Sequence, residues 1–283
     1  MASFKDKLTE AIQLAKNKGF EQSRAEWLML DLFGWSRTDY LMHMYDEMSE
    51  AEEAKFSLAV ERMLLGEPIQ YIVGFQMFYG LQFQVNSHCL IPRPETEEVM
   101  LHFLERVKEE ATVVDIGTGS GALAVSLKKL NPKLNVIATD VVQETLDLAK
   151  DNAYHHDADI EFLHGDALKP LIKNNIKVDG LISNPPYIDY EEVNSMADTV
   201  VKYEPHVALF AKNKGYAIYE SILNELPKVL NEDAYVTFEI GYNQSEILKG
   251  LILNKYPNLS VNVIKDINGI DRIVSFEWKY VMR

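Results

Sequence analysis

Residues 112–140, TVVDIGTGSGALAVSLKKLNPKLNVIATD, decide the fold of this 283-residue chain. An apolar run at Thr112–Ile116 leads into a glycine-rich loop, and a helix-periodic segment follows as far as Asn131-Pro132. A second apolar run, Leu134–Thr139, comes next and ends at Asp140. This order of strand, helix and strand predicts two parallel strands joined by a crossover helix.

The same alternation continues towards the C-terminus. It predicts an α/β, Rossmann-like sheet that is mostly parallel, with helices on both faces and a last strand that runs antiparallel. Asn268-Gly269 is typical of a hairpin turn between the last two strands. The further strands are expected at residues 160–164, 178–183, 235–240, 259–264 and 272–278, and the further helices at residues 144–153, 215–230 and 244–255.

The first 66 residues carry the apolar spacing of helices instead. We expect a small helical bundle here, with helices at residues 4–18 and 23–33, a short one capped by Ser36, and one at residues 49–65. Residues 67–91 are rich in aromatic and β-branched side chains, which predicts a β-hairpin that turns near Phe78–Gly80. The predicted domains are a helical domain at 1–66, a β-hairpin linker at 67–92 and an α/β domain at 93–283.

Composition limits the classes of protein that need to be considered. Hydrophobic residues make up 47% of the chain, enough for a sizeable core, and a single cysteine, Cys89, excludes an internal disulfide framework and a cysteine-rich metal site. The N-terminus lacks the apolar core of a signal peptide, and no stretch approaches the ~20 apolar residues of a membrane span. We therefore expect a soluble, cytoplasmic protein. The net charge of −15 counts against non-specific binding of nucleic acid, although it does not exclude a local basic patch.

Polar residues follow the first three strands, at the edge where an open α/β sheet binds its ligands. The loop Gly117-Thr118-Gly119-Ser120-Gly121 allows a close backbone approach to a ligand, although an ordinary turn can look the same. Asp140 suits either the two hydroxyls of a ribose or a helix cap. Asp166, followed by Ala167, suits either an adenine amine or a turn. Since no P-loop lysine is present, the set favours a nucleoside without a triphosphate.

The strongest signal, Asn184-Pro185-Pro186-Tyr187, follows the fourth strand. The two prolines end the strand ladder and stiffen the backbone. The side-chain oxygen of Asn184 and the carbonyl of Pro185 are two fixed acceptors for the N–H bonds of a planar NH₂ group, and Tyr187 offers a flat face against which such a group can stack. The alternative is a proline-rich loop with a capping asparagine.

These motifs together resemble those of the class I S-adenosylmethionine-dependent methyltransferases, and Asn-Pro-Pro-Tyr is similar to the motif of the branch that methylates planar amino and amide nitrogens. Further segments resemble the release factor glutamine N5-methyltransferases over essentially the whole chain. Ala167 stands where some members carry a large aromatic residue. The segments that carry this resemblance are Gly66–Gly74, Phe78–Leu81, Leu90–Glu97, Glu204-Pro205, Ala208–Phe210, Glu239–Gly241 and Asp271–Ile273.

The resemblance implies methyl transfer from S-adenosylmethionine to the side-chain amide nitrogen of the glutamine in the Gly-Gly-Gln motif of class I release factors. The products would be N5-methylglutamine and S-adenosylhomocysteine, and no metal would be needed. The helical domain would recognise the substrate. The methyl donor is expected to bind at Gly117, Thr118, Gly119, Ser120, Gly121, Asp140, Asp166, Ala167 and Asn184. Catalysis and substrate binding are expected at Asn184, Pro185, Pro186 and Tyr187.

Arg93 and the choice of substrate leave alternatives open. Arg93 either shapes the substrate pocket or pairs with Glu95 or Glu97. An adenine-N6 methyltransferase acting on DNA or RNA would need a basic groove and a path for a flipped base, so the charge and the linker count against it. A non-catalytic binding protein would have no need of the intact motifs. We expect a monomer with release factors as partners, without stable binding to nucleic acid or membrane.

Overall fold

The computed structural model describes residues 2–279, and these divide into two compact units. We call residues 2–75 together with Ala197–Tyr203 the helical unit, and residues 76–196 together with 204–279 the sheet unit. Each is a separate body with its own core, and the pocket described below belongs to the sheet unit alone.

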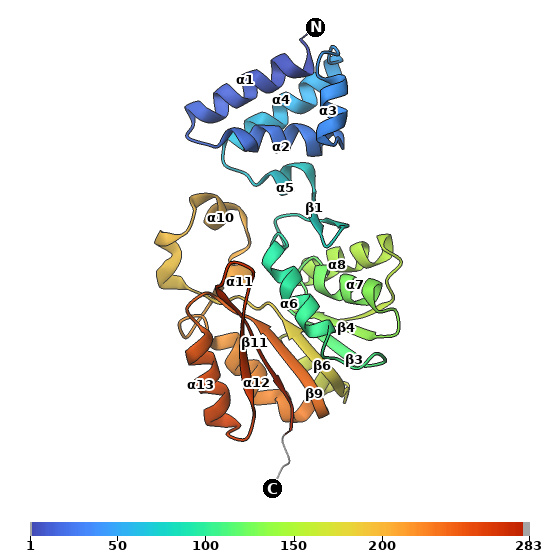
Figure 1. The fold of residues 1–283 in the computed structure, drawn as a ribbon, viewed down its shortest axis with the longest axis vertical. Helices are drawn as coiled ribbons and strands as arrows, with labels where there is room; N and C mark the ends of the chain where they lie inside the picture. The colour runs from blue at the N-terminus through green and yellow to red at the C-terminus, as the bar shows by residue number, and fades with distance from the viewer. Residues whose placement is uncertain (1, 280–283) are drawn as a thin grey trace. The chain divides into compact units, whose positions relative to one another are not determined.

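The helical unit contains the predicted bundle (Figure 1). Ser3, Ser36 and Ser49 each close a capping box, in which the hydroxyl accepts a backbone N–H and a carboxylate three residues on accepts from the serine N–H. One helix was not predicted: Pro68 starts a short helix that Gly74 ends, so the β-hairpin is shorter than expected. The helices of this unit are α1 (Phe4–Asn17), α2 (Gln22–Phe33), α3 (Arg37–His43), α4 (Glu50–Leu64), α5 (Ile69–Val73) and α10 (Asp198–Tyr203).

The sheet unit is built on a seven-stranded sheet in the order β10-β11-β9-β6-β3-β4-β5. Strand β11 runs antiparallel to both of its neighbours, β9 and β10, and the other pairs are parallel. The predicted fold class is thus confirmed, with β11 inside the sheet and β10 at its edge. The strands are β3 (Thr112–Ile116), β4 (Asn135–Asp140), β5 (Ile160–His164), β6 (Val178–Ser183), β9 (Leu230–Glu239), β10 (Val261–Lys265) and β11 (Asp271–Glu277).

Helices cover both faces of this sheet because its strands are apolar on both sides. Neighbouring residues of a strand point to opposite faces, so Val113 joins one core cluster and Val114 the other. The first cluster includes residues of α6 and α7, and the second includes residues of α12 and α13. The longer helices are α6 (Pro94–Leu104), α7 (Ala122–Leu130), α8 (Gln143–His155), α12 (Ala217–Val229) and α13 (Ser245–Lys255), with a short α9 (Lys169–Lys173) after β5.

Short elements that the sequence did not predict follow β6. Strand β7 (Ile188–Asp189) pairs in parallel with β8 (Phe210–Ala211) and holds the start of the segment after Tyr187. A 3₁₀ helix, η1 (Tyr190–Ser195), and α11 (His206–Leu209) complete the connection. The predicted hairpin before α6 is present as β1 (Phe75–Phe78) and β2 (Leu81–Gln84), with Tyr79 and Gly80 at the turn.

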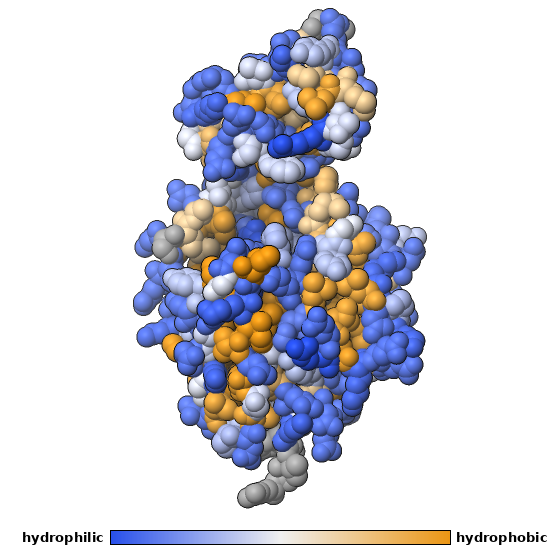
Figure 2. All heavy atoms as spheres, viewed as in Figure 1, coloured by the Kyte–Doolittle hydropathy of each residue, from blue (hydrophilic) through white to orange (hydrophobic). Residues whose placement is uncertain are grey.

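The surface is mixed in polarity. On the face shown in Figure 2, hydrophilic residues surround separate apolar areas rather than a continuous apolar band. Among residues 2–279, no helix combines the length and the hydropathy that crossing a bilayer demands.

Candidate active site

A pocket that is partly open to solvent lies at the carboxyl ends of the parallel strands of the sheet unit. Its position is the one expected for the ligand site of an open α/β sheet. Most residues predicted as a site line it together, whereas Gly121 and Tyr187 are not part of its lining. The predicted residues in the lining are Arg93, Gly117, Thr118, Gly119, Ser120, Asp140, Asp166, Ala167, Asn184, Pro185 and Pro186.

The glycine loop is held by bonds to the neighbouring strand. The backbone N–H groups of Gly117 and Thr118 both donate to the carbonyl of Thr139 at 2.9 Å, and the Thr118 hydroxyl donates to Asp115 Oδ2 at 2.7 Å. Burial raises the pKa of Asp115 to about 7. Gly121 begins α7, where a Cβ would lie 3.2 Å from the side chain of Ala149. Gly121 therefore allows α7 and α8 to pack closely beneath the loop.

Asp140 connects the glycine loop to the start of α8. Its Oδ2 accepts the N–H of Gly119 at 3.1 Å, and its Oδ1 accepts the N–H of Val142 at 3.0 Å. Burial raises the pKa of Asp140, and the backbone N–H bonds oppose that shift. Since a carboxylate has about four acceptor positions, these two bonds leave room for donors from a ligand. The structural and the ligand-binding interpretations of Asp140 are thus compatible.

Asp166 and Ala167 form the part of the pocket beyond β5. Asp166 is half exposed and pairs with Lys169, so a ligand amine would share this carboxylate with a lysine. Ala167 is buried and has a φ of +48°, a left-handed conformation that is strained for a residue with a Cβ. The methyl side chain of Ala167 limits what it can contribute to apolar contact.

The Asn184-Pro185-Pro186-Tyr187 segment is fixed at both ends. Asn184 Nδ2 donates to Thr96 Oγ1 at 3.2 Å, which leaves Oδ1 without a partner among the residues the structure describes. At the other end, Gln244 Nε2 donates to the carbonyl of Tyr187 at 2.8 Å. A Cβ on Gly215 would lie only 2.0 Å from the same carbonyl, so that position requires glycine.

The Tyr187 ring lies against the core cluster that contains α12 and α13. Burial raises the pKa of its hydroxyl, so Tyr187 stays neutral. In this arrangement the ring supports the Asn184-Pro185-Pro186-Tyr187 segment from the side of the core. Its predicted stacking against a planar group of the substrate stays a prediction.

Arg93 lines the pocket and has a definite partner. Its Nη2 donates to Glu204 Oε1 at 2.6 Å, and not to Glu95 or Glu97, the partners that one of the two alternatives named. Glu204 is only 4% exposed and also accepts the N–H of Ile91 at 3.4 Å. Because the ion pair is nearly buried on the carboxylate side, it fixes the wall of the pocket.

Comparisons with known proteins identify the chain. Residues 6–74 match the family model described as PrmC N-terminal domain, and residues 95–220 match Methyltransferase small domain. The release factor glutamine methyltransferase of Staphylococcus aureus is 62% identical over 98% of this chain and 100% of its own length. That of Enterococcus faecalis is 41% identical over 95% and 97%. The chain belongs to the release factor glutamine methyltransferase family.

The fold of this methyltransferase is shared by distant solved structures. A methyltransferase from Pyrococcus furiosus superposes with a TM-score of 0.55 at 19% identity, covering 79% of this chain and 100% of its own. Membership of a methyltransferase family implies S-adenosylmethionine as the methyl donor. The lining of the pocket is chemically suited to S-adenosylmethionine, because a backbone loop open to a ligand, two carboxylates and apolar walls meet there.

Several residues of the site in this methyltransferase were missed by sequence reasoning. Thr96, Glu204, Glu239 and Gln244 hold the predicted residues in place, and no local pattern gives their roles. Thr96, Glu204 and Glu239 lie in segments that carry the family resemblance, but that resemblance gave them no role in the site. Among residues 2–279, no three His, Cys, Asp or Glu side chains are grouped to hold a metal, and the expectation of a metal-free reaction stays a prediction.

Proposed function

We propose that this methyltransferase methylates the side-chain amide nitrogen of the glutamine in the Gly-Gly-Gln motif of class I release factors. The observation that carries the proposal is the unpartnered Oδ1 of Asn184 in a pocket shared with the glycine loop. A carboxamide oxygen is an acceptor for an NH₂ group, which is the group that a glutamine offers. The names of the relatives from S. aureus and E. faecalis support the choice of substrate.

The same pocket offers a consistent arrangement for the methyl donor. Asp140 would accept hydrogen bonds from the ribose hydroxyls, and Asp166 would accept one from the adenine amine. The backbone of Gly117–Ser120 would contact the rest of the methyl donor. Bound S-adenosylmethionine supplies an electrophilic methyl group on its sulfonium. The order of the strands, β5-β4-β3-β6, sets the nucleoside contacts beside the Asn184 segment, where the substrate amide would enter.

The chemistry would depend on positioning and electrostatics. An amide nitrogen is a weak nucleophile because its lone pair is delocalised into the carbonyl. Asn184 Oδ1 and the Pro185 carbonyl would accept its two N–H bonds and direct the lone pair at the methyl group. As the N–C bond forms and the C–S bond breaks, the nitrogen becomes tetrahedral and its protons become more acidic. Acceptors set for that geometry stabilise the transition state more than the ground state, and the methylated nitrogen then gives one proton to water.

Mass spectrometry of a release factor incubated with enzyme and S-adenosylmethionine tests the proposal. We expect one added methyl group on the glutamine of Gly-Gly-Gln, and none on a release factor in which asparagine replaces that glutamine. Duplex DNA and RNA serve as competing substrates in the same assay. Methyl transfer to adenine, with an unmodified glutamine, would replace the proposal by the adenine-N6 alternative.

Location and assembly are part of the same proposal. Release factors work with ribosomes, so the enzyme is expected in the cytoplasm, without stable nucleic-acid or membrane binding of its own. We expect a monomer, which sedimentation at working concentration tests. A stable dimer in that measurement would contradict this part of the proposal and leave the choice of substrate unaffected.

A further inference from the structure

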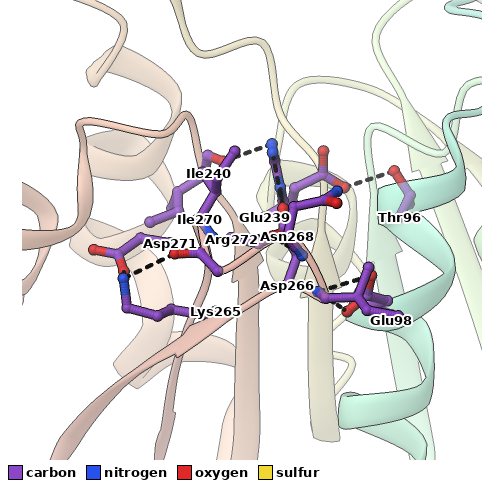
Figure 3. Close-up of polar contacts among 12 residues, drawn as sticks. Thr96, Glu98, Glu239, Ile240, Lys265, Asp266, Asn268, Ile270, Asp271 and Arg272 are labelled. Atoms are coloured by element: carbon purple, nitrogen blue, oxygen red, sulfur yellow. Dashed lines mark hydrogen bonds and ion pairs between the residues drawn. The ribbon is translucent and has the colours of Figure 1, made fainter.

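Asn184, Thr96 and Glu239 form a hydrogen-bonded chain that runs from the pocket into the interior of the sheet unit. Asn184 Nδ2 lies 3.2 Å from Thr96 Oγ1, which lies 2.6 Å from Glu239 Oε2. Figure 3 shows the second of these bonds, between the first turn of α6 and the end of β9. Thr96 is 5% exposed and Glu239 is 1% exposed, so water cannot readily replace either partner.

The direction of this chain follows from counting hydrogens. A threonine hydroxyl has a single hydrogen, and an ionised carboxylate can only accept. Thr96 therefore donates to Glu239, and its oxygen can only accept from Asn184. The Asn184 carboxamide must then direct its NH₂ at Thr96 and its oxygen away from it. Asn184 Oδ1 becomes the acceptor that a substrate amide requires.

We propose that Thr96 and Glu239 are positioning residues, and that ionised Glu239, acting through the Thr96 hydroxyl, decides which atom of the Asn184 carboxamide serves the substrate. The inference rests on the proposed function, because only an NH₂-bearing substrate needs an acceptor at this place. Thr96 lines the pocket and Glu239 lies outside its lining, and in this proposal both act on the substrate through Asn184.

A proton on Glu239 would reverse the chain. A neutral carboxyl group can donate to Thr96 Oγ1, which frees the threonine hydrogen to donate in turn. The carboxamide of Asn184 would then rotate to offer its oxygen to Thr96. Its NH₂ would then face the substrate in place of Oδ1. The NH₂ of Asn184 and the NH₂ of the substrate are both donors, so they cannot form a hydrogen bond. The protonated form is therefore expected to be inactive.

The charges around Glu239 make this reversal accessible near neutral pH. Burial raises the pKa of Glu239 to about 7, while the Thr96 bond and the charges of Arg272 and Arg93 lower it, and Glu95 raises it. Arg272, on β11, is itself paired with Asp266 at 3.2 Å (Figure 3). The Tyr219 hydroxyl of α12 donates to the backbone carbonyl of Glu239 at 2.6 Å, and the neutral phenol of Tyr187 lies on the loop side.

The pH profile of kcat, measured on release factor at saturating S-adenosylmethionine, tests the chain. The variants are Thr96→Val, Thr96→Ser and Glu239→Gln, with Thr237→Val as the matched control. Thr237 is also buried, lies on β9 two residues before Glu239, and has a hydroxyl without a partner among the described residues. Its replacement by valine removes the same group without touching the chain.

We expect kcat of the wild type to rise with pH through an inflection near the pKa of Glu239, about 7. Thr96→Val should lower kcat by roughly tenfold, the value of about one hydrogen bond, and abolish the inflection. Thr96→Ser should restore both. Glu239→Gln cannot ionise, so its pH profile should be flat whatever its level of activity. Thr237→Val should match the wild type, and the donor dissociation constant should be unchanged in all four variants.

A second measurement needs no substrate. The side-chain ¹⁵NH₂ signals of Asn184, assigned by their loss in Asn184→Ala, should move with pH in the wild type and in Thr237→Val. They should stay constant in Thr96→Val and Glu239→Gln.

The failure of the hydrogen-bonded chain and the failure of the proposed function give different results. A wild-type kcat profile in Thr96→Val, or wild-type Asn184 signals that do not respond to pH, would overturn the chain while glutamine methylation stands. An unmodified glutamine with the wild-type enzyme would instead refute the proposed function, and the amide signals would still decide whether the chain exists.

Discussion

The capping carboxylates of the helical unit and the fully buried acids of the sheet unit have pKa values shifted in opposite directions. In the helical unit, Asp6, Asp39 and Glu52 are exposed capping groups, and hydrogen bonds from serine residues lower their pKa. In the sheet unit, burial raises the pKa of Asp115 and Glu239 to about 7. All polar and charged side chains that are buried in the described part of the chain belong to the sheet unit.

This difference separates two tasks. The helical unit is held by local caps and by an apolar core that includes Phe56 and Met63, an arrangement that stabilises a shape. The sheet unit keeps buried acids at the carboxyl edge of its sheet, where their desolvation works against stability. Such groups are retained where their placement serves chemistry. Substitutions in the two units should therefore affect different measurements.

The largest effect is expected from Phe56→Ala in the core of the helical unit. Phe56 is buried on α4, and removal of a buried phenylalanine side chain lowers the free energy of unfolding by about 3–5 kcal/mol. Chemical denaturation measures the loss. Leu58→Ala, at an exposed position of the same helix, is the control and should change stability by less than about 0.5 kcal/mol. Equal losses in the two variants would show that this core does not stabilise the unit.

Asn184→Ala should act on activity instead. Loss of the acceptor is expected to lower kcat by on the order of 3 kcal/mol, as for one oxyanion-hole contact. Affinity for the methyl donor and the melting temperature should change far less. Asn135→Ala, at an exposed site on β4, should behave like the wild type. A parallel loss of donor affinity and rate would assign Asn184 to the donor rather than to the substrate.

Asp140→Ala should weaken donor binding first. The loss is expected to be about 2 kcal/mol, the range for hydrogen bonds to a charged group, and calorimetric titration with S-adenosylmethionine measures it. The exposed Asp147, on the adjoining helix α8, supplies the control Asp147→Ala. An unchanged dissociation constant in Asp140→Ala would mean that this carboxylate only holds Gly119 and Val142.

A rise in pH should change the stability of the two units in opposite directions. Raised pKa values mean that the folded sheet unit binds more protons than the unfolded chain, so its stability falls as pH rises towards about 7. Lowered pKa values in the caps mean that the helical unit loses stability as pH falls below about 4. Scanning calorimetry over this range should show the melting temperature of the sheet unit decreasing with pH, and decreasing less in Glu239→Gln. A rise with pH would contradict the assignment.

The smallest effect is expected from Ser49→Ala at the start of α4. The bond from the Glu52 N–H to the Ser49 hydroxyl would be lost, at about 1 kcal/mol of stability, while the backbone N–H of residue 49 can still donate to Glu52, and kcat should not change. Ser49→Asp should retain most of the stability, because aspartate is also a good N-cap. A change in kcat without a change in stability would show that α4 has a role in catalysis.

The sequence by itself determined the order of the strands along the chain and brought most of the predicted site residues to one pocket. Apolar periodicity is a local property, and the carboxyl ends of parallel strands must meet at one edge, so Asp140 and Asn184 could be brought to the same pocket without coordinates. The capping boxes at Ser36 and Ser49 are equally local, since donor and acceptor lie three residues apart.

Only the tertiary structure decided the partners of those residues. Thr96 meets Glu239 across 143 positions of sequence and Asn184 across 88, and Arg93 meets Glu204 across 111. Periodicity shows which residues turn inwards, but it carries no information about which inward group from a distant element completes a hydrogen bond. The helix α5 and the pairing of β7 with β8 escaped prediction because elements of two to five residues are too short to establish a period.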